Sequence, residues 1–328
     1  MSWLVGATLL FLGVSLVLYV LFAGADFGAG ILELFLGRVR RAEQRQLISH
    51  AMAPVWEANH VWLVLAIVIV FMGFPPLYQK LCVSLHLPMI AVLVGIVLRG
   101  SAFTFRYYDT VTPDFHKFYS WVFVVSSLWT PFFLGVTAAA FVHGPPQATA
   151  ATYYAFYVAP WASLFCAAVG VLACCAFAFL AAVYLVGEAE DAVMRNLFRK
   201  RAAWANAAMV LVGGIVFLAA WWEGVPLLEA FVSQPLTLAC FALASGLLVP
   251  FWWALLRMPE RTWWVRTLGA ALVTWVMAGW FSTQAPYSLF VSAAAPEATL
   301  RVLLGALVFG SVCIFPALLF LFRVFKTA

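Results

Sequence analysis

The stretch Pro54–Trp62, read P-V-W-E-A-N-H-V-W, decides how the rest of the chain is interpreted. It opens an apolar run that reaches residue 75. Its polar and aromatic residues are Trp56, Glu57, Asn59, His60 and Trp62. Ionisable groups are costly where a helix enters lipid, so they usually face protein or water and serve a function. We therefore expect a membrane protein whose function depends on this stretch.

The composition also places the chain in a membrane. Of its 328 residues, 66% are hydrophobic and 9% are charged, whereas a soluble chain carries about 25% charged residues. The net charge of +5 does not indicate nucleic-acid binding, because the basic residues are distributed as membrane orientation requires. The six cysteines show no metal-ligand spacing and are interpreted as small buried hydrophobes. We expect no cleavable signal peptide, since the first apolar run is too long and lacks preceding basic residues.

Nine apolar runs are long enough to cross about 30 Å of hydrocarbon as helices of about 20 residues. They are 3–35, 55–75, 80–103, 120–142, 157–186, 203–222, 235–256, 264–283 and 299–322. Backbone groups in lipid must be satisfied within each segment, which favours helices. The sequence thus predicts an all-α polytopic membrane protein with nine transmembrane helices in one integral membrane domain, 1–328. The first run exceeds the need of a bilayer and must tilt, kink or protrude.

The basic residues predict the orientation of these helices. All but Lys80 and Arg301 of the 18 fall on one side of the alternating topology. They are Arg38, Arg40, Arg41 and Arg45 after run 1, Arg99, Arg106 and Lys117 after run 3, Arg195, Arg199, Lys200 and Arg201 after run 5, Arg257, Arg261 and Arg266 after run 7, and Arg323 and Lys326 in the tail. Cytoplasmic loops carry this excess, so we expect the N-terminus outside and the C-terminus in the cytoplasm.

Intramembrane polarity is concentrated in the first four runs. It comprises Asp26, Glu33, Glu57, Asn59, His60, His86 and Arg99. We therefore expect residues 1–142 to form the functional bundle, and the five helices of 157–328 to supply packing or lipid-facing mass.

Asp26 lies in the segment G-A-D-F-G-A-G. Gly24 and Gly28 are one helical turn apart, and such small residues let another helix approach closely. Asp26, Gly30 and Glu33 share one stripe, which stacks two carboxylates along a helix. The stripe favours a cytoplasm-facing proton entry; the alternative is that both acids are solvated at headgroup level.

Glu57 is expected at a depth similar to that of Asp26. Runs 1 and 2 are antiparallel and joined by a basic loop, which brings both acids to the cytoplasmic side. Carboxyl groups held in a membrane interior can pass protons. His60 shares the face of Glu57, where it could relay protons or simply form a hydrogen bond.

The remaining polar residues leave alternatives open. His60 and His86 lie in opposite membrane halves, so they match a bis-histidine haem poorly. Arg99 and Arg106 could snorkel to the cytoplasmic interface or bind an anionic lipid or a partner carboxylate. The sequence shows no haem-ligand constellation and no nucleotide-binding loop.

Several stretches resemble subunit II of the cytochrome bd-type quinol oxidases, including the cyanide-insensitive branch. The matching pieces are G-A-D-F-G-A-G-I-L (24–32), F-L-G-R (35–38), A-P-V-W-E-A-N-H-V-W-L (53–63), F-P-P-L-Y (74–78), L-R-G-S-A-F-T-F-R (98–106), the Pro131/Gly135 pair and, more weakly, Tyr184 to Glu188 followed by Arg195. The first half matches specifically, and the second half matches mainly by helix count and length.

The resemblance implies a multi-pass subunit of an O2-reducing quinol oxidase in the bacterial cytoplasmic membrane. The partner, subunit I, is expected to hold two b-type haems, one haem d or another haem b, and the quinol-oxidising loop. Subunit II is expected to bind no haem, to hold the complex together, and to contribute acids to a proton path from the cytoplasm. The resemblance leaves open whether the subunit binds a structural quinone, lipid or a small single-helix accessory subunit. Nucleic acid is not expected.

Two positions depart from the family pattern. Glu57 stands where the family commonly has Asp, so the acid is kept and lengthened. Ala23 stands where many members have a further acid, which shifts the expected proton path onto Asp26 and Glu57. The motif residues that accompany them are Gly24, Gly28, Gly30, Trp56, Asn59, Trp62, Arg99 and Arg106.

Two other functions compete with this reading. A proton-coupled secondary transporter could use Asp26 and Glu57 as coupling-ion sites, but such proteins repeat interrupted helices in two halves. Runs 6 to 9 contain no second acidic, glycine-rich segment. An assembly-only subunit of the same oxidase would need the helices but not the acids.

Overall fold

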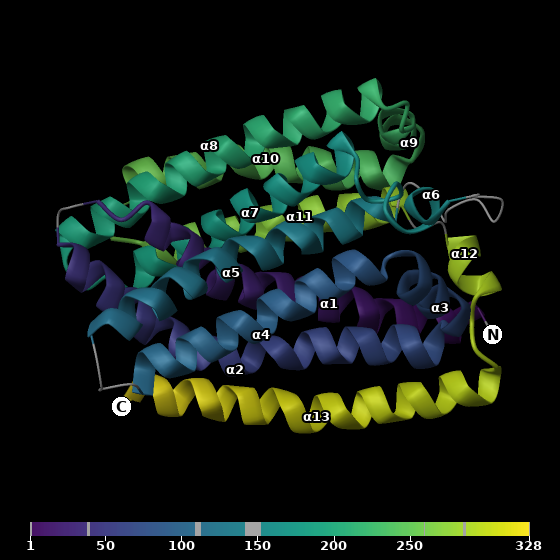
Figure 1. Cartoon of the computed structure of the whole chain (residues 1–328), viewed down its shortest axis with the longest axis horizontal. Coiled ribbons are helices and arrows are strands. Elements are labelled where there is room, and N and C mark those ends of the chain that lie inside the picture. The colour runs from purple at the N-terminus through teal and green to yellow at the C-terminus, as the bar shows by residue number, and fades with distance from the viewer. Residues whose placement is uncertain are drawn as a thin grey trace.

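The structure is a computed structural model that describes residues 2–37, 40–108, 113–141, 152–258, 260–284 and 287–327. Side chains at 52–58, and at some other helix positions near the gaps and the C-terminus, fall outside that description. The described residues form helices and contain no strand, which confirms the all-α fold class (Figure 1).

Nine of the described helices are long and four are short. The long ones are α1 (Ser2–Leu34), α2 (Arg41–Gly73), α4 (His86–Tyr108), α5 (Pro113–Ala140), α7 (Leu164–Glu188), α8 (Ala192–Trp222), α10 (Pro235–Arg257), α11 (Thr262–Gln284) and α13 (Glu297–Thr327). The short ones are α3 (Pro75–Ser84), α6 (Tyr153–Tyr157), α9 (Leu227–Ser233) and α12 (Tyr287–Ser292), and they lie together at one end of the bundle (Figure 1).

Seven described helices are long and apolar enough to cross a membrane, or eight if the bent pair α2 and α3 forms one span. Helix α11 has the length, but its mean hydropathy keeps it out of that group. The prediction of nine crossings therefore stays a prediction, as does the side on which each terminus lies.

Several predicted boundaries were wrong. Helix α2 begins at Arg41, well before the apolar run that starts at residue 55, because a helix extends beyond the hydrocarbon wherever its backbone can hydrogen-bond. The run 80–103 is divided between α3 and α4. Arg99 and Arg106 lie inside α4, so they are helix residues and not loop residues.

The sequence F-P-P explains the break after α2. Phe74 ends α2, and Pro75 and Pro76 occupy the first turn of α3, where a missing N–H costs little. The two helices meet at 116°. Because α3 turns aside, it delivers the chain to the start of α4 at the short-helix end.

Helix α7 lies at the centre of the molecule. It packs against α1, α5 and α8 (Figure 1), and its sequence is apolar on all sides, as a buried helix requires. The Ser163 hydroxyl caps it by accepting the Cys166 N–H at 3.1 Å. Helix α13 packs against α1 and α2, and residues 23–33 of α1 are all buried among the surrounding helices.

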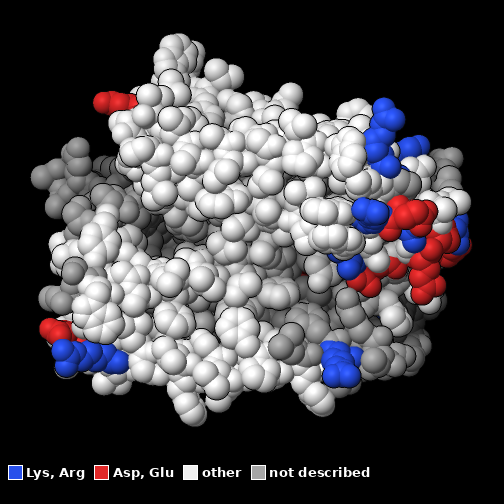
Figure 2. All heavy atoms as spheres, turned by 180° about the vertical axis from the view of Figure 1, so that it is seen from behind, with Lys and Arg blue, Asp and Glu red and all other residues white. Residues whose placement is uncertain are grey.

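Charged side chains gather near the ends of the long axis, with a nearly uncharged band between them on the face seen in Figure 2. We call one end the basic end: there the α1–α2, α4–α5, α7–α8 and α10–α11 connections come together. Ion pairs Arg40–Asp191 and Arg195–Glu260 join three of these connections. The uncharged band is the surface expected to face hydrocarbon.

Candidate functional site

A polar stripe runs along the buried face of α1. Tyr19, Asp26 and Glu33 are seven residues apart, and each has at most 4% of its surface exposed. Seven residues are close to two helical turns, so the three side chains lie above one another. Both acids are buried in protein, so the alternative that they are solvated was wrong, whereas their depth in the membrane stays a prediction.

Helix α4 carries a matching pair of arginines. Arg99 pairs with Asp26, and Arg106 pairs with Glu33. Both pairs join residues 73 positions apart, so α1 and α4 run in the same direction. We call these contacts the two-rung ladder, with the Asp26–Arg99 rung deeper and the Glu33–Arg106 rung nearer the basic end.

The deeper rung is enclosed by protein. Asp26 is fully buried and Arg99 nearly so. The Asn59 amide on α2 donates to Asp26 Oδ2 at 3.5 Å. The Arg99 guanidinium lies over the rings of Phe27, Phe103 and Phe123, at 5.2, 5.6 and 5.1 Å, where cation–π attraction partly offsets its lost hydration. The snorkelling alternative for Arg99 was therefore wrong.

The outer rung has forked geometry. Arg106 donates from Nη1 to Glu33 Oε2 at 3.1 Å and from Nη2 to Oε1 at 2.7 Å. Such bidentate pairs are among the stronger hydrogen bonds in proteins. Arg45 of α2 adds a second cation at 3.7 Å, and Ser49 accepts from Arg106 at 3.4 Å. Glu33 thus binds α1 to both α2 and α4.

Glycines allow this packing. A Cβ at Gly24 would overlap the Leu180 side chain, and one at Gly28 would overlap the Phe177 carbonyl, both on α7. The close helix approach expected from these two residues is therefore made by α7. Gly30 faces α5 instead, where a Cβ would strike the Ser127 hydroxyl.

Glu57 and Trp56 lie on α2, but their side chains fall outside the described residues. On the same helix, Asn59 contacts Asp26. The opposite side of α2 carries the stripe of Val61, Val64 and Val68, whose exposed fractions are 38%, 58% and 41%.

His60 and Trp62 lie on either side of the inner face of α2. His60 is partly buried and close enough to Asp26 to interact with its charge. Trp62 is buried against Phe315 of α13, with ring centroids 5.8 Å apart. Its indole N–H has no hydrogen-bond partner within the part of the chain that the structure describes.

The described histidines do not fit a bis-histidine haem. His86 begins α4, where its ring packs on Tyr157 and its Nδ1 lies 3.0 Å from the Val83 carbonyl. Arg99 is thirteen residues further along, about 20 Å at 1.5 Å per residue, and it is level with Asn59. His60 and His86 are therefore far apart along the bundle. Groups of three or more His, Cys, Asp or Glu that could hold a metal do not occur among the described residues.

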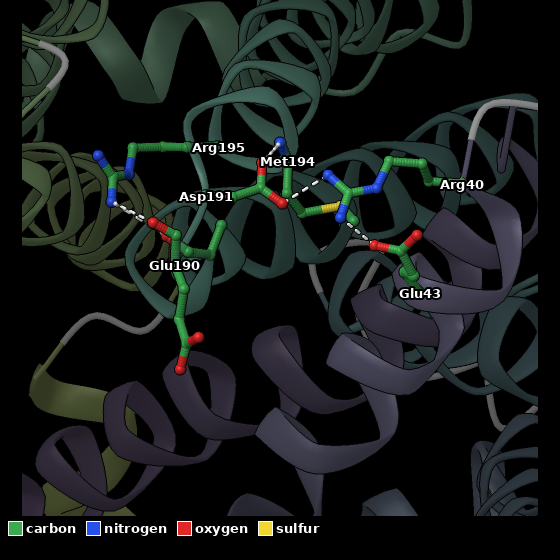
Figure 3. Close-up of polar contacts among 7 residues, drawn as sticks. Arg40, Glu43, Glu190, Asp191, Met194 and Arg195 are labelled. Carbon is green, nitrogen blue, oxygen red and sulfur yellow. Dashed lines mark hydrogen bonds and ion pairs between the residues drawn. The ribbon is translucent and has the colours of Figure 1, made fainter.

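A second group of polar contacts lies at the basic end. Figure 3 shows Arg40 between Glu43 and Asp191, with an Arg40–Asp191 distance of 2.5 Å. Asp191 also caps α8 by accepting the Met194 N–H at 2.8 Å. That N–H and the Arg40 guanidinium lower the pKa of Asp191 below its ordinary value. Arg40 adopts a left-handed backbone conformation, φ 52°, which residues other than glycine rarely take.

The sequence reasoning found the acids but missed what surrounds them. It did not pair Asp26 with Arg99 or Glu33 with Arg106, and it did not single out Phe123 or Ser127. The signal was present, because the two acids of run 1 and the arginines at 99 and 106 have the same seven-residue spacing. Parallel helices, which the predicted topology already implied, would pair Asp26 with Arg99 and Glu33 with Arg106, whereas antiparallel helices would exchange the partners.

The family model described as "Cytochrome bd terminal oxidase subunit II" matches residues 5–325. The chain is 34% identical over 145 residues to "Cytochrome bd ubiquinol oxidase subunit 2" of Bacillus subtilis (strain 168), which covers 44% of this chain and 40% of that protein. It is 29% identical over 137 residues to "Cytochrome bd-I ubiquinol oxidase subunit 2" of Escherichia coli (strain K12), covering 42% and 35%.

These alignments span about two fifths of the curated relatives they match. Among solved structures, a chain of the bd oxidase from Geobacillus thermodenitrificans superposes with a TM-score of 0.77 at 19% identity, covering 98% of both chains. At that identity, the match supports the fold alone.

Proposed function

We propose, since the chain belongs to the cytochrome bd terminal oxidase subunit II family, that it is the companion subunit of a quinol:oxygen oxidoreductase. It is a bacterial membrane protein, and we place it in the cytoplasmic membrane. Its partner is a subunit I that carries the b-type haems and a haem d or further haem b, oxidises quinol and reduces oxygen to water. In this proposal the chain itself binds no haem.

The parallel direction of α1 and α4 supports nine crossings. Two parallel helices must be joined by an odd number of crossings, and α2 with its bent extension α3 supplies one. Adding α11 to the eight spans gives nine. The basic end then faces the cytoplasm, since Lys and Arg concentrate on that side of membranes.

The outward stripe of α2 supports the position of the partner. Val61, Val64 and Val68 form an exposed row on α2, and a carboxyl group of the same helix would be costly against lipid tails. A polar or hydrated surface of subunit I would remove that cost. We therefore propose that subunit I covers this stripe and that Glu57 lies at the subunit boundary.

The acids then define a proton path from the cytoplasm. Asp26 and the Glu57 position lie within one helical turn of each other in depth, because Asn59 contacts Asp26. His60 lies between them on α2 and can hold or pass a proton. The path would bring protons toward the oxygen-reducing haem of subunit I, which supplies the redox chemistry.

A second candidate is favoured by the arginines. Each buried acid of α1 already has a cationic partner from α4, and such pairs can serve to fix helix positions. In this alternative the subunit supports assembly only, and Glu57 and Asp26 carry no protons.

Co-purification tests the subunit assignment. The tagged chain, extracted in mild detergent, is expected to bring down a haem-bearing partner and the visible spectrum of bound haem. The same chain expressed without its partner should show no haem spectrum. Stoichiometric haem in the chain alone would overturn the proposed division of roles.

Glu57→Gln separates the two candidates, because it removes the titrating group while keeping its size. We expect an assembled complex with full haem content and a large loss of quinol-driven oxygen consumption. Gln79→Glu, which adds an acid on the exposed short helix α3 at the other end, provides the comparison. Normal turnover in Glu57→Gln would favour the assembly-only candidate.

A further inference from the structure

Ser127 is the polar side chain that lies between the two rungs of the ladder. It is fully buried on α5, and its hydroxyl lies against the bare Cα of Gly30. Gly30 is one turn from Asp26 and about one turn from Glu33 on α1. A Cβ at Gly30 would overlap the Ser127 side chain, so the glycine is what lets this hydroxyl pack directly against α1 between the two rungs.

Several buried polar atoms of Ser127, Arg99 and Asn59 lack hydrogen-bond partners among the described residues. The Ser127 hydroxyl has none among the described residues, although a buried hydroxyl usually finds one. On the deeper rung, Arg99 binds Asp26 through Nη2, while its Nε and Nη1 are buried and unpartnered. Asn59 Oδ1 is also buried without a partner. These are donors and an acceptor of the kind that internal water satisfies.

Phe123 closes the opposite side. It lies one turn before Ser127 on α5, and both guanidinium groups contact its ring, Arg99 at 5.1 Å and Arg106 at 4.9 Å. The ring separates the two arginines and offers no strong hydrogen bond. One turn further along α5, Ser127 places a buried hydroxyl beside this ring.

We propose that the Ser127 hydroxyl and water bound to it and to the unpartnered nitrogens of Arg99 connect the Glu33–Arg106 rung to the Asp26–Arg99 rung. The hydroxyl accepts from one neighbour and donates to another, so it orients the water between the rungs. Ser127 is thus a positioning residue for the α1 acids. The role of Ser127 in proton movement rests on the proposed function, whereas the presence of the bound water is independent of that function.

The neighbouring serine supplies a matched control. Ser126 has a hydroxyl that donates to the Val122 carbonyl at 2.6 Å, within its own helix. Ser127→Ala and Ser126→Ala make the same chemical change at adjacent positions. Both complexes would be purified with their partner, checked for haem content, and imaged by cryo-EM at a resolution that shows ordered water.

The parent map should show water within hydrogen-bond distance of Ser127 Oγ and an Arg99 nitrogen. This water should be lost in Ser127→Ala and retained in Ser126→Ala. Ser127→Ala should also slow oxygen-linked proton uptake several-fold and shift its pH profile, whereas Ser126→Ala should do neither. A parent map with no water there would overturn the proposal.

Asp26→Asn distinguishes the two possible failures. If Asp26→Asn and Ser127→Ala both leave proton uptake normal while the water is present, the proton path is wrong and the water site stands. If Asp26→Asn slows uptake but Ser127→Ala matches Ser126→Ala, the connecting role of Ser127 is refuted. Should Ser127→Ala fail to assemble, the parent map alone decides whether the water exists.

Discussion

The first four long helices bury charged and polar side chains, whereas the later helices bury almost only apolar ones. Among the described residues, every buried acid and arginine lies in α1 or α4, and the buried polar residues beyond α7 are Asn206 and Thr237. Helices α8, α10 and α11, with residues of α7 and α9, instead line a partly open cavity of about 350 Å³ whose lining is almost entirely apolar. One half therefore holds charge in the membrane, and the other provides apolar bulk.

The two halves should therefore respond differently to substitution. Removing one partner of a buried ion pair leaves an unpaired charge, whereas changing an apolar cavity wall alters only packing. The polar half is the one that the sequence motifs identify, and the apolar half is the one where similarity is mainly in helix length. Substitutions in the two halves can test the comparison.

The largest effect is expected from Arg99→Ala. It leaves Asp26 buried without its cation, which costs about 3–5 kcal/mol in comparable pairs. We expect poor assembly and a lower unfolding temperature of the detergent-extracted complex. Arg301→Ala is the control, because its pair with Glu297 is exposed, and it should change stability little.

An apolar replacement of both partners sharpens that result. Asp26→Leu with Arg99→Met removes both charges and fills the site with apolar side chains, so assembly should recover toward the parent level. If the double variant is as unstable as Arg99→Ala alone, the loss comes from packing and not from the unpaired carboxylate.

A smaller loss is expected from Gly28→Ala. The new Cβ would overlap the Phe177 carbonyl and push α1 away from α7, and overpacking typically costs about 1–3 kcal/mol. Gly13→Ala on the same helix meets nothing within 4 Å and serves as the control. Thermal unfolding of both should separate them; equal stability would contradict the close α1–α7 approach.

In the apolar half, Gly213→Ala should leave stability unchanged or increase it. Gly213 lines the cavity and its Cβ would meet nothing within 4 Å. Alanine in a helix interior is favoured over glycine by about 0.5–1 kcal/mol. We expect a slightly higher unfolding temperature and unchanged oxygen consumption. A marked fall in turnover would assign this half a function beyond packing.

The smallest effect is expected from Asp191→Asn at the basic end. Asparagine can still cap α8, so the variant removes mainly the charge that faces Arg40. Because the folded-state pKa of Asp191 lies below its ordinary 3.8, its contribution is present above that value and is lost as the pH falls through the lowered folded-state pKa. The stability difference from the parent should thus narrow in acid. A difference independent of pH would contradict the pairing.

Sequence alone predicted the helical class and the membrane environment, and it singled out the acids of α1 as candidate site residues, because hydropathy and charge are local signals. It misplaced the start of α2 and merged α3 with α4, since a helix can continue beyond its apolar run and the turn at Pro75 has no hydropathy signature. The ladder was missed because pairing depends on which helices are neighbours. Ser127 was missed because a lone serine in an apolar run looks like any helix residue until Gly30 is placed against it.

We propose that Asp26 and Glu57 carry protons to the partner subunit. This is tested by proton uptake during oxygen reduction in the complete complex, with Asp26→Asn and Glu57→Gln compared with the parent at equal haem content. We expect slower uptake and turnover in both variants, with haem spectra unchanged. Uptake at the parental rate in both would contradict it.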